Sequence, residues 1–380
     1  MRLFVILLTS VLFLCSCGNG NRQSGGRPDE TAVSPCTASR FRIDNFQGFR
    51  KLTVFNPWQN SNGNELVYYL VPHDVKLPDT IPDSQVVRVP VKRIVCMSTT
   101  HTAMLSALGE TEIIIGISGT GLVYDSLILD AVASGAIRDV GYESNLDKEL
   151  IVSLKPDLLM AYGVEASSAE YLRKLTEMGV KVMYNADYLE EHPLARCEWI
   201  KVFGLLTGRE AIADSLFRQV SAAYFSLADE VRTTAKNQPD VLLGAPWQDV
   251  WYISPANSYM GRLISDAGGR YLFDDLAESN SVPYAVEAVF RRATEADIWF
   301  NPGTAGSLND IAIADHRMTK LPVFTSGCIW NNRNRMTPSG GNDYWEGAVV
   351  HPDLLLRDLV SILHPELLPG YKQLYFRRLE

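Results

Sequence analysis

Residues 145–163 read Asn-Leu-Asp-Lys-Glu-Leu-Ile-Val-Ser-Leu-Lys-Pro-Asp-Leu-Leu-Met-Ala-Tyr-Gly, and residues 175–184 read Leu-Thr-Glu-Met-Gly-Val-Lys-Val-Met-Tyr. Short apolar runs here follow segments with helical spacing. The pattern predicts helix, strand, helix and strand in turn, at 150–154, 157–162, 166–178 and 180–184. Strands that alternate with helices are typical of an α/β layer with a mainly parallel sheet.

The same alternation continues on both sides of this stretch. Upstream, strands at 93–97 and 113–117 flank a helix at 102–108. Downstream, a second series has strands at 240–244, 297–300 and 322–325, and helices at 260–267, 286–294, 308–316 and 352–363. The sequence therefore predicts an N-terminal lobe over 92–193 and a C-terminal lobe over 237–380.

A helical region separates the two lobes. Residues 194–236 carry no strand pattern and are interrupted at Thr207-Gly208. The second piece, from Arg209 to about Lys236, would be roughly 40 Å long at about 1.5 Å per residue. We expect this long rigid helix to join the lobes as a strut.

The residues before the first lobe divide into two parts. Residues 18–40 are rich in Gly, Asn, Ser, Arg and Pro and predict a flexible tether. Residues 41–91 hold strand-like runs at 51–55, 65–71 and 86–89, broken by Asn, Gly and Pro. These runs indicate a small antiparallel β appendage.

The first 17 residues predict a signal. Arg2 precedes an apolar run from Leu3 to Leu14, which is shorter than the roughly 20 residues of a membrane-spanning helix. The residues that follow this run, Cys15-Ser16-Cys17, are similar to the bacterial lipobox, with Cys17 as the lipidated thiol. This predicts a periplasmic protein held to a bacterial membrane through its lipid anchor only. The alternative is an ordinary cleaved signal that carries two thiols.

Composition excludes some partners. A formal charge of −9, with 46% hydrophobic and 21% charged residues, fits a globular protein that does not bind nucleic acid. Beyond the signal, Cys36, Cys96, Cys197 and Cys328 are far apart and form no CxxC pair. We expect free thiols, although disulfides remain an open alternative.

The run Glu149-Leu-Ile-Val-Ser-Leu-Lys-Pro-Asp-Leu158, followed by Met178-Gly-Val-Lys-Val182, resembles the N-terminal lobe of the periplasmic binding proteins for cobalamin, haem and ferric siderophores. Gly204-Leu-Leu-Thr-Gly208 supports the resemblance, which covers residues 92–366. The resemblance implies a monomeric, non-enzymatic receptor with two lobes. It would capture a small-molecule metal chelate, with iron or cobalt, and deliver it to the permease dimer of an ABC importer.

The family docks on its permease through one acidic residue per lobe. The matching positions here are Glu149 and Glu287. The second match is looser, because Arg291-Arg-Ala-Thr-Glu-Ala296 lacks the usual proline before the strand. A carboxylate in the first turn of a helix also stabilises that helix, which is the alternative role of both residues.

Ligands of α/β sheets bind at the carboxyl ends of the strands. Aromatic side chains there suit a large, flat, partly apolar ligand, although each could instead pack in a core. From the N-terminal lobe this selects Met97, Ser98, Thr99, His101, Tyr124, Tyr162 and Glu165. From the C-terminal lobe it selects Pro246, Trp247, Trp251, Tyr252, Asn301 and Trp330. The polar, aromatic loop at 330–345 adds Arg333, Arg335, Tyr344 and Trp345, or is a solvated loop.

The sequence indicates no resident cofactor and no metal ion held by the protein itself. The six histidines show no close spacing and no His-rich loop. No G-x-S-x-G, HExxH, P-loop or GxGxxG motif is present. An extracytoplasmic α/β enzyme and a lipid-anchored interaction module are the alternatives to a transport receptor.

Overall fold

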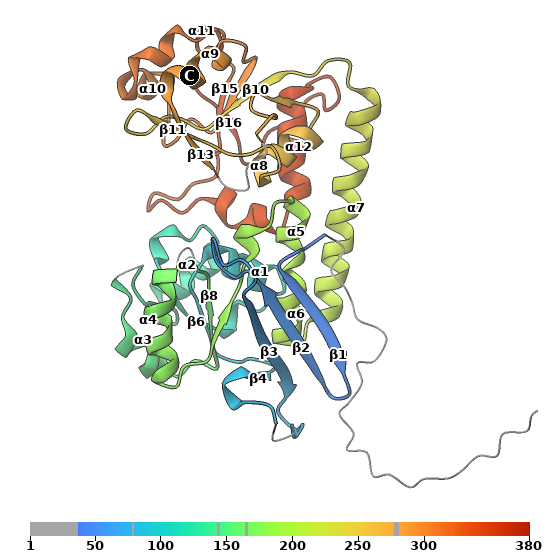
Figure 1. Ribbon diagram of the computed structural model, residues 1–380, viewed down its shortest axis with the longest axis vertical. Helices are drawn as coiled ribbons and strands as arrows, with labels where there is room; N and C mark the ends of the chain where they lie inside the picture. The colour runs from blue at the N-terminus through green and yellow to red at the C-terminus, as the bar shows by residue number, and fades with distance from the viewer. Residues whose placement is uncertain (1–36, 78–79, 143–144, 164–165, 277–280) are drawn as a thin grey trace, which may run out of the picture.

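The computed structural model describes residues 37–77, 80–142, 145–163, 166–276 and 281–380. It has two α/β lobes, one above the other in Figure 1, with a long helix beside both. That helix, α7 (Glu210–Thr234), has 25 residues, or about 37 Å at 1.5 Å per residue. The predicted strut is therefore present.

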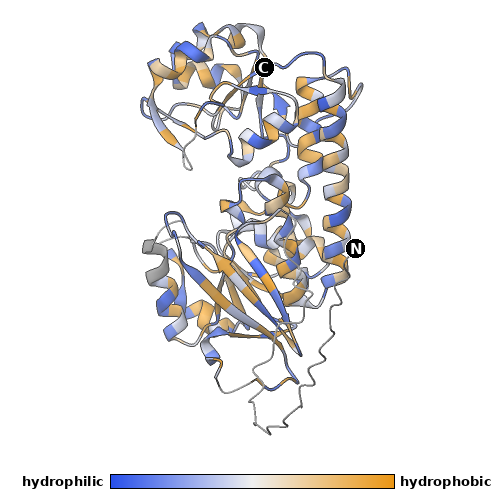
Figure 2. Ribbon diagram, turned by 45° about the vertical axis from the view of Figure 1, so that its right-hand side comes forward, coloured by the Kyte–Doolittle hydropathy of each residue, from blue (hydrophilic) through white to orange (hydrophobic). Residues whose placement is uncertain are grey.

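Helix α7 is amphipathic along its whole length. Its buried residues recur every three or four positions, and Figure 2 shows hydrophobic and hydrophilic residues interleaved along it. They are Ala213, Phe217, Val220, Tyr224, Leu227 and Val231. A single apolar stripe thus packs the strut against the helices at 193–207 that precede it and against the C-terminal lobe.

The N-terminal lobe contains a parallel five-stranded sheet in the order β7-β6-β5-β8-β9. Its strands are β5 (Ile94–Cys96), β6 (Ile114–Ile117), β7 (Arg138–Asp139), β8 (Leu158–Ala161) and β9 (Val182–Tyr184). Its helices are α1 (Thr99–Ala107), α2 (Ser126–Ala133), α3 (Lys148–Leu154) and α4 (Ala166–Glu177). Every residue of β5, β6 and β8 is buried, as continuous apolar strands between helical layers require.

The C-terminal lobe has a second five-stranded sheet in the order β12-β10-β14-β15-β16. All its pairs are parallel except β15–β16. The strands are β10 (Asp240–Leu243), β12 (Arg270–Tyr271), β14 (Ile298–Phe300), β15 (Ile329–Asn331) and β16 (Arg377–Arg378). A separate antiparallel pair consists of β11 (Val250–Ile253) and β13 (Val282–Ala285). The helices are α8 (Tyr259–Asp266), α9 (Val286–Ala293), α10 (Leu308–Ala314), α11 (Pro322–Ser326) and α12 (Pro352–Leu363).

The predicted strand at 322–325 was wrong, because these residues form α11. Pro322 stands at the start of that helix, where its missing N–H costs nothing, and the helix ends at Gly327 with φ 65°. The strand comes a few residues later, as β15. Two short helices, α5 (Pro193–Glu198) and α6 (Ile200–Thr207), precede the strut, and Gly208 ends α6 with φ 74°.

The N-terminal strands are β1 (Phe41–Phe46), β2 (Phe49–Phe55), β3 (Glu65–Pro72) and β4 (Val86–Val89). The first three are antiparallel, but β4 pairs parallel with β3, so the purely antiparallel prediction was wrong. A connection longer than a hairpin lets the chain return in the same direction. The sheet packs on the linking helices: the ring of Phe41 lies 4.8 Å from that of Trp199, and the Val91 N–H donates to the Leu206 carbonyl at 2.8 Å.

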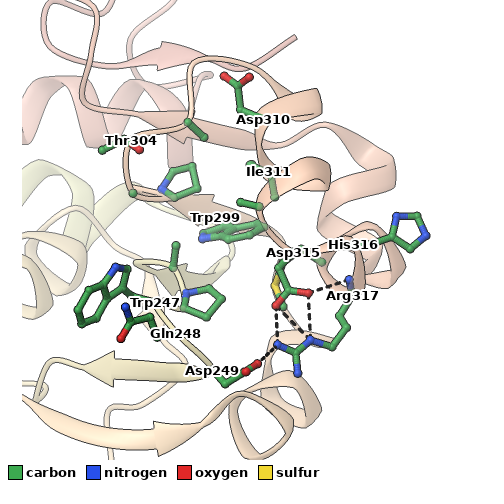
Figure 3. A pocket seen from close by; sticks show the side chains of 17 residues that line it. Trp247, Gln248, Asp249, Trp299, Thr304, Asp310, Ile311, Asp315, His316 and Arg317 are labelled. Carbon is green, nitrogen blue, oxygen red and sulfur yellow. Dashed lines mark hydrogen bonds and ion pairs between the residues drawn. The ribbon is translucent and has the colours of Figure 1, made fainter.

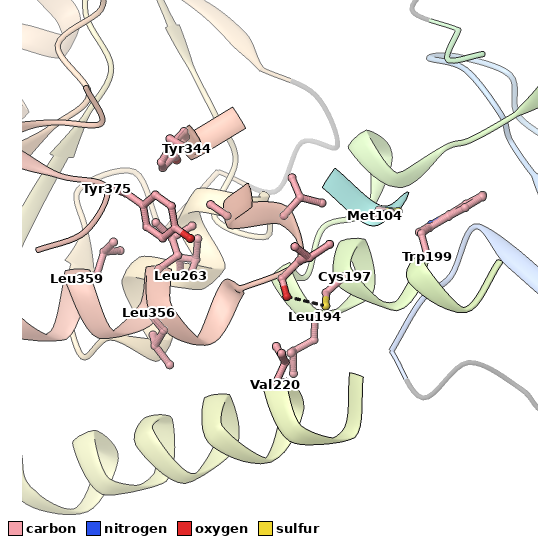
Figure 4. Packing of buried hydrophobic residues seen from close by; sticks show 14 of the residues in the cluster. Met104, Leu194, Cys197, Trp199, Val220, Leu263, Tyr344, Leu356, Leu359 and Tyr375 are labelled. Atoms are coloured by element: carbon pink, nitrogen blue, oxygen red, sulfur yellow. Dashed lines mark hydrogen bonds between the residues drawn. The ribbon is translucent and has the colours of Figure 1, made fainter. Parts of the chain in front are cut away.

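One hydrophobic cluster runs through both lobes. It includes Met104 from the N-terminal lobe, Leu194 and Val220 from the linking helices, and Leu356 from α12, as Figure 4 shows in part. The Cys197 thiol donates to the Val350 carbonyl at 3.5 Å within it. The lobes therefore share packed side chains at their junction, which limits how far they can separate.

Candidate ligand-binding cleft

The N-terminal lobe presents its strand ends through three segments. Ser98 follows β5 and caps α1, since its hydroxyl accepts the Thr100 N–H at 3.2 Å. Thr99 and Tyr124 are half-buried, whereas Met97 is buried. Tyr162 follows β8 and lies edge-on to the ring of Tyr188. Glu165 lies outside the described residues.

His101 is enclosed within the N-terminal lobe. Its side chain is fully buried, with its ring 6.0 Å from that of Phe203. Burial lowers its pKa to about 3, so the imidazole is neutral in neutral solution. In this conformation His101 presents no surface to a ligand.

The C-terminal lobe exposes aromatic rings at its strand ends. Trp247 follows β10 and is 65% exposed, and Tyr252 on β11 is 54% exposed. Trp251, between them, is fully buried and donates its indole N–H to the Leu243 carbonyl at 3.1 Å, as a core residue does. Asn301 follows β14 with φ 54°, and Trp330 is half-buried in β15.

A pocket of about 790 Å³ opens at the carboxyl ends of β10 and β14. Figure 3 shows Trp247 and Gln248 on one side of it and Asp315 and Arg317 on the other. Gln248 and Asp249 have φ values of 50° and 61°, a conformation that costs energy without glycine and recurs at functional sites. Its further lining includes Pro246, Trp299, Gly303, Thr304, Asp310 and His316.

Arg317 connects three acidic residues at the rim of this pocket. Its guanidinium Nη2 lies 2.6 Å from Asp249 Oδ1 and 2.8 Å from Asp315 Oδ2, and its Nη1 lies 2.9 Å from Glu287 Oε1. Hydrogen bonds from the guanidinium lower the pKa of Asp315. Arg317 therefore joins the pocket to the first turn of α9, which carries Glu287.

The loop after β15 brings residues of the two lobes together. The Arg335 guanidinium carbon lies 4.9 Å from the centroid of the Tyr124 ring, and the Thr99 hydroxyl donates to the Trp345 carbonyl at 3.3 Å. Trp345 is 54% exposed and stands perpendicular to the ring of Tyr344, which is buried. Arg333 is half-buried in the same loop.

The structure thus brings Thr99, Tyr124, Arg335 and Trp345 together between the lobes, while Trp247 and Tyr252 lie on the C-terminal lobe. Sequence reasoning missed Asp249, Arg317 and Glu346. The available signal for Glu346 was its place between an aromatic residue and Gly347, directly after the selected loop at 330–345. Arg317 directly follows the predicted helix at 308–316. Charged residues are common at helix ends, so the sequence did not mark Arg317 as a functional residue.

Both acidic docking candidates are exposed residues in the first turn of a helix. Glu149 lies in α3, which Asp147 caps through the Leu150 N–H at 2.8 Å, and Glu287 lies in α9. Their places match the pattern expected on both lobes. Unlike Glu287, which pairs with Arg317, Glu149 has no ion pair with any described residue.

Cys96, Cys197 and Cys328 are free thiols, as predicted, whereas Cys17 and Cys36 lie outside the described residues. In the part of the chain that the structure describes, no three His, Cys, Asp or Glu side chains gather where they could hold a metal ion. No helix among those residues has the length and apolar character needed to cross a membrane.

The sequence profile described as "Periplasmic binding protein" matches residues 94–318. An uncharacterised lipoprotein of Methanocaldococcus jannaschii is 28% identical over 303 residues, 77% of this chain and 70% of the relative. An uncharacterised ABC transporter substrate-binding lipoprotein of Bacillus subtilis, YvrC, is 25% identical over 177 residues, 46% of this chain and 53% of the relative.

Solved structures share the fold. A periplasmic haem-binding protein of Pseudomonas aeruginosa superposes with a TM-score of 0.57 at 18% identity, covering 76% of this chain and 98% of that one. The vitamin B12-binding protein BtuF of Vibrio cholerae has a TM-score of 0.50 at 13% identity, covering 73% and 99%. The two lobes, the strut and the profile match agree, and this chain belongs to the periplasmic binding protein family, whose members are substrate-binding proteins of ABC transporters.

Proposed function

We propose that this chain is the substrate-binding lipoprotein of an ABC importer for a chelated metal, namely a ferric siderophore, haem or cobalamin complex. The observation that carries the proposal is the exposure of three large rings on the ligand-facing segments: Trp247, Tyr252 and Trp345 are each more than half exposed. Two of these rings lie near the carboxyl ends of strands in the C-terminal lobe, where α/β sheets bind their ligands. A flat conjugated or catecholate ligand offers them a stacking partner.

The pocket volume supports a ligand of this size. About 790 Å³ lies within the range of roughly 300–1,000 Å³ that small-molecule and cofactor sites occupy. Residues of the C-terminal lobe alone line this pocket, so it would hold one side of a ligand that lies between the lobes. The names of two proteins with this fold, a haem-binding and a vitamin B12-binding protein, point to the same chemical class. The ligand would carry its own metal, so we propose no resident cofactor.

Delivery would use the permease dimer of the importer. We propose that Glu149 and Glu287 pair with permease arginines, one on each lobe, and that Cys17 carries the lipid that holds the protein at the outer side of a membrane. The names of the relatives, which are lipoproteins, support the anchor. Incorporation of radiolabelled palmitate that is lost in Cys17→Ser is the expected result. Equal labelling of both proteins would refute the anchor.

Tryptophan quenching by haem, cobalamin and ferric siderophores tests the ligand class. We expect one of them to quench saturably, and Trp247→Leu or Trp345→Leu to weaken its binding about tenfold, since an aromatic contact of this kind contributes about 1.4 kcal/mol. Phe225→Leu, which replaces an exposed aromatic residue of the strut, is the matched control. Failure of all three classes to bind would contradict the proposal.

A further inference from the structure

Residues 332–350, called the strap here, follow β15 and precede α12. In Figure 1 the strap runs between the two lobes, in the red part of the ribbon. It contains two short 3-10 helices, η7 (Asp343–Trp345) and η8 (Gly347–Val349). It lies beyond residues 94–318, which the family profile matches. The strap therefore lies outside the matched part of the chain, where the lobes meet.

Glu346 joins the strap to the N-terminal lobe. Its Oε2 accepts the Tyr124 N–H at 2.6 Å, and its Oε1 accepts the Asp125 N–H at 3.2 Å. Glu346 is 2% exposed. Hydrogen bonds from backbone N–H groups to a buried carboxylate are among the stronger ones in proteins. Both donors stand at the start of α2, where Asp125 caps the helix through the Leu127 N–H.

The strap backbone also lies directly against the N-terminal lobe. A Cβ atom at Gly341 would lie 2.0 Å from the Val123 carbonyl oxygen, so no side chain fits there. The strap is itself braced, since Arg335 Nε donates to Asp343 Oδ2 at 2.7 Å and Asn342 Nδ2 donates to the Asn332 carbonyl at 3.0 Å. Because these bonds hold the strap in one conformation, a change in its contact with one lobe would alter its position relative to the other lobe.

We propose that Glu346 is a positioning residue for ligand capture: it latches the strap to the N-terminal lobe and thereby sets the separation of the lobes. The latch also holds two ligand candidates in place, because Trp345 precedes Glu346 and Tyr124 supplies one of the N–H donors. The ligand part of this inference rests on the proposed function. The latch itself involves protein groups alone and can be measured without a ligand.

Backbone hydrogen exchange of the full chain tests the latch, because its donors are amides. Glu346→Ala removes the acceptor, and Gly341→Ala forces the strap away without changing a charge. Both variants should raise exchange at Tyr124 and Asp125 about tenfold, as loss of a buried hydrogen bond predicts. X-ray scattering should show a larger radius of gyration for both variants. Glu346→Gln keeps one of the two acceptor oxygens, so its exchange at Tyr124 and Asp125 should lie between that of the wild type and that of Glu346→Ala.

Glu112→Gln, which removes an exposed carboxylate of the same lobe, is the matched control. Unchanged exchange in β8 and β14 shows that a variant is folded. If Glu346→Ala does not fold, Gly341→Ala serves as the test of the latch. Wild-type exchange at Tyr124 and Asp125 in both variants would overturn the latch. Faster exchange with an unchanged radius would overturn its control of lobe separation. If the latch results hold but haem, cobalamin and ferric siderophores do not bind, the proposed function alone fails.

Discussion

Glu287 and Arg317 form an ion pair at the surface of the C-terminal lobe, with 2.9 Å between Oε1 and Nη1. The glutamate is the proposed docking residue, and the arginine also pairs with Asp249 at the candidate ligand pocket. The Glu287 side chain is 75% exposed, so solvent screens the pair and it contributes little to stability. A permease arginine could replace Arg317 at little cost, and a ligand that contacts Asp249 or Arg317 would affect the docking carboxylate.

Arg317→Gln should therefore increase the affinity of the ligand-free protein for its permease. Because solvent screens the internal pair, the gain in affinity should not exceed about fivefold. Surface plasmon resonance on permease in lipid nanodiscs measures it, with Lys320→Gln as a control for loss of a nearby positive charge. Reduced affinity in Arg317→Gln would show that Arg317 supports docking instead of competing with it.

Removing the docking carboxylates should separate transport from ligand binding. Glu149→Ala and Glu287→Ala should each lower uptake severalfold, since each removes one of two ion pairs with the permease. Affinity for the chelate should stay as in the wild type for Glu149→Ala. For Glu287→Ala it should change less than uptake does, because Glu287 reaches the pocket only through Arg317. Uptake assays and fluorescence titration check the two effects. Wild-type uptake in the double variant would reject these docking residues.

The latch should depend on pH. Burial raises the pKa of Glu346 to about 7, although the Tyr124 and Asp125 amides oppose this. A released Glu346 would return to about 4.5, so the latched state binds the proton more tightly. Latching is then favoured fully below pH 4.5 and loses that advantage as the pH rises through 7. The charged groups around Glu346 are Asp125, Asp343, Arg335 and His351.

We accordingly expect the radius of gyration, and exchange corrected for its intrinsic pH dependence, to increase between pH 5 and pH 8. Glu346→Gln carries no titrating group at this position and should respond little. Asp343→Asn and His351→Gln test whether neighbours cause the change. Equal pH responses of the wild type and Glu346→Gln would assign the effect to another group.

A buried carboxylate anchors the start of the described chain. Glu190 accepts the Ser39 N–H at 3.0 Å, the Arg40 N–H at 2.9 Å and the Trp199 indole N–H at 3.1 Å. Glu190→Ala leaves these donors without their acceptor and should lower the free energy of unfolding by about 3 kcal/mol. Urea denaturation measures the change, with the exposed Glu65→Ala as control. A change below about 0.5 kcal/mol would show that water replaces the carboxylate.

Local patterns predicted the parallel lobes and the strut, because periodic apolar runs and terminating glycines act within a few residues. The short helix that begins at Pro322 was not predicted, because its five residues fit the pattern of a strand as well as that of a single helical turn. The parallel direction of β4 was not predicted, because the direction of a strand depends on the path of the connection that precedes it. At the candidate site, the sequence pattern predicted which residues follow the strands but not which of them are exposed. Trp247 and Trp251 are four residues apart, yet Trp251 is buried and Trp247 faces solvent. The Glu346 latch depends on contacts across more than 220 positions, which local sequence does not encode.

The most direct test of the central claim, that this protein binds a chelate between its lobes and releases it unchanged, is quantitative recovery of the ligand. The full chain is saturated with the chelate that quenches its tryptophans, separated from excess, and denatured, and the released ligand is measured by absorbance and mass spectrometry. We predict one intact chelate per chain, with its metal in place. Recovery of a cleaved, reduced or demetallated product would contradict the account and indicate an enzyme.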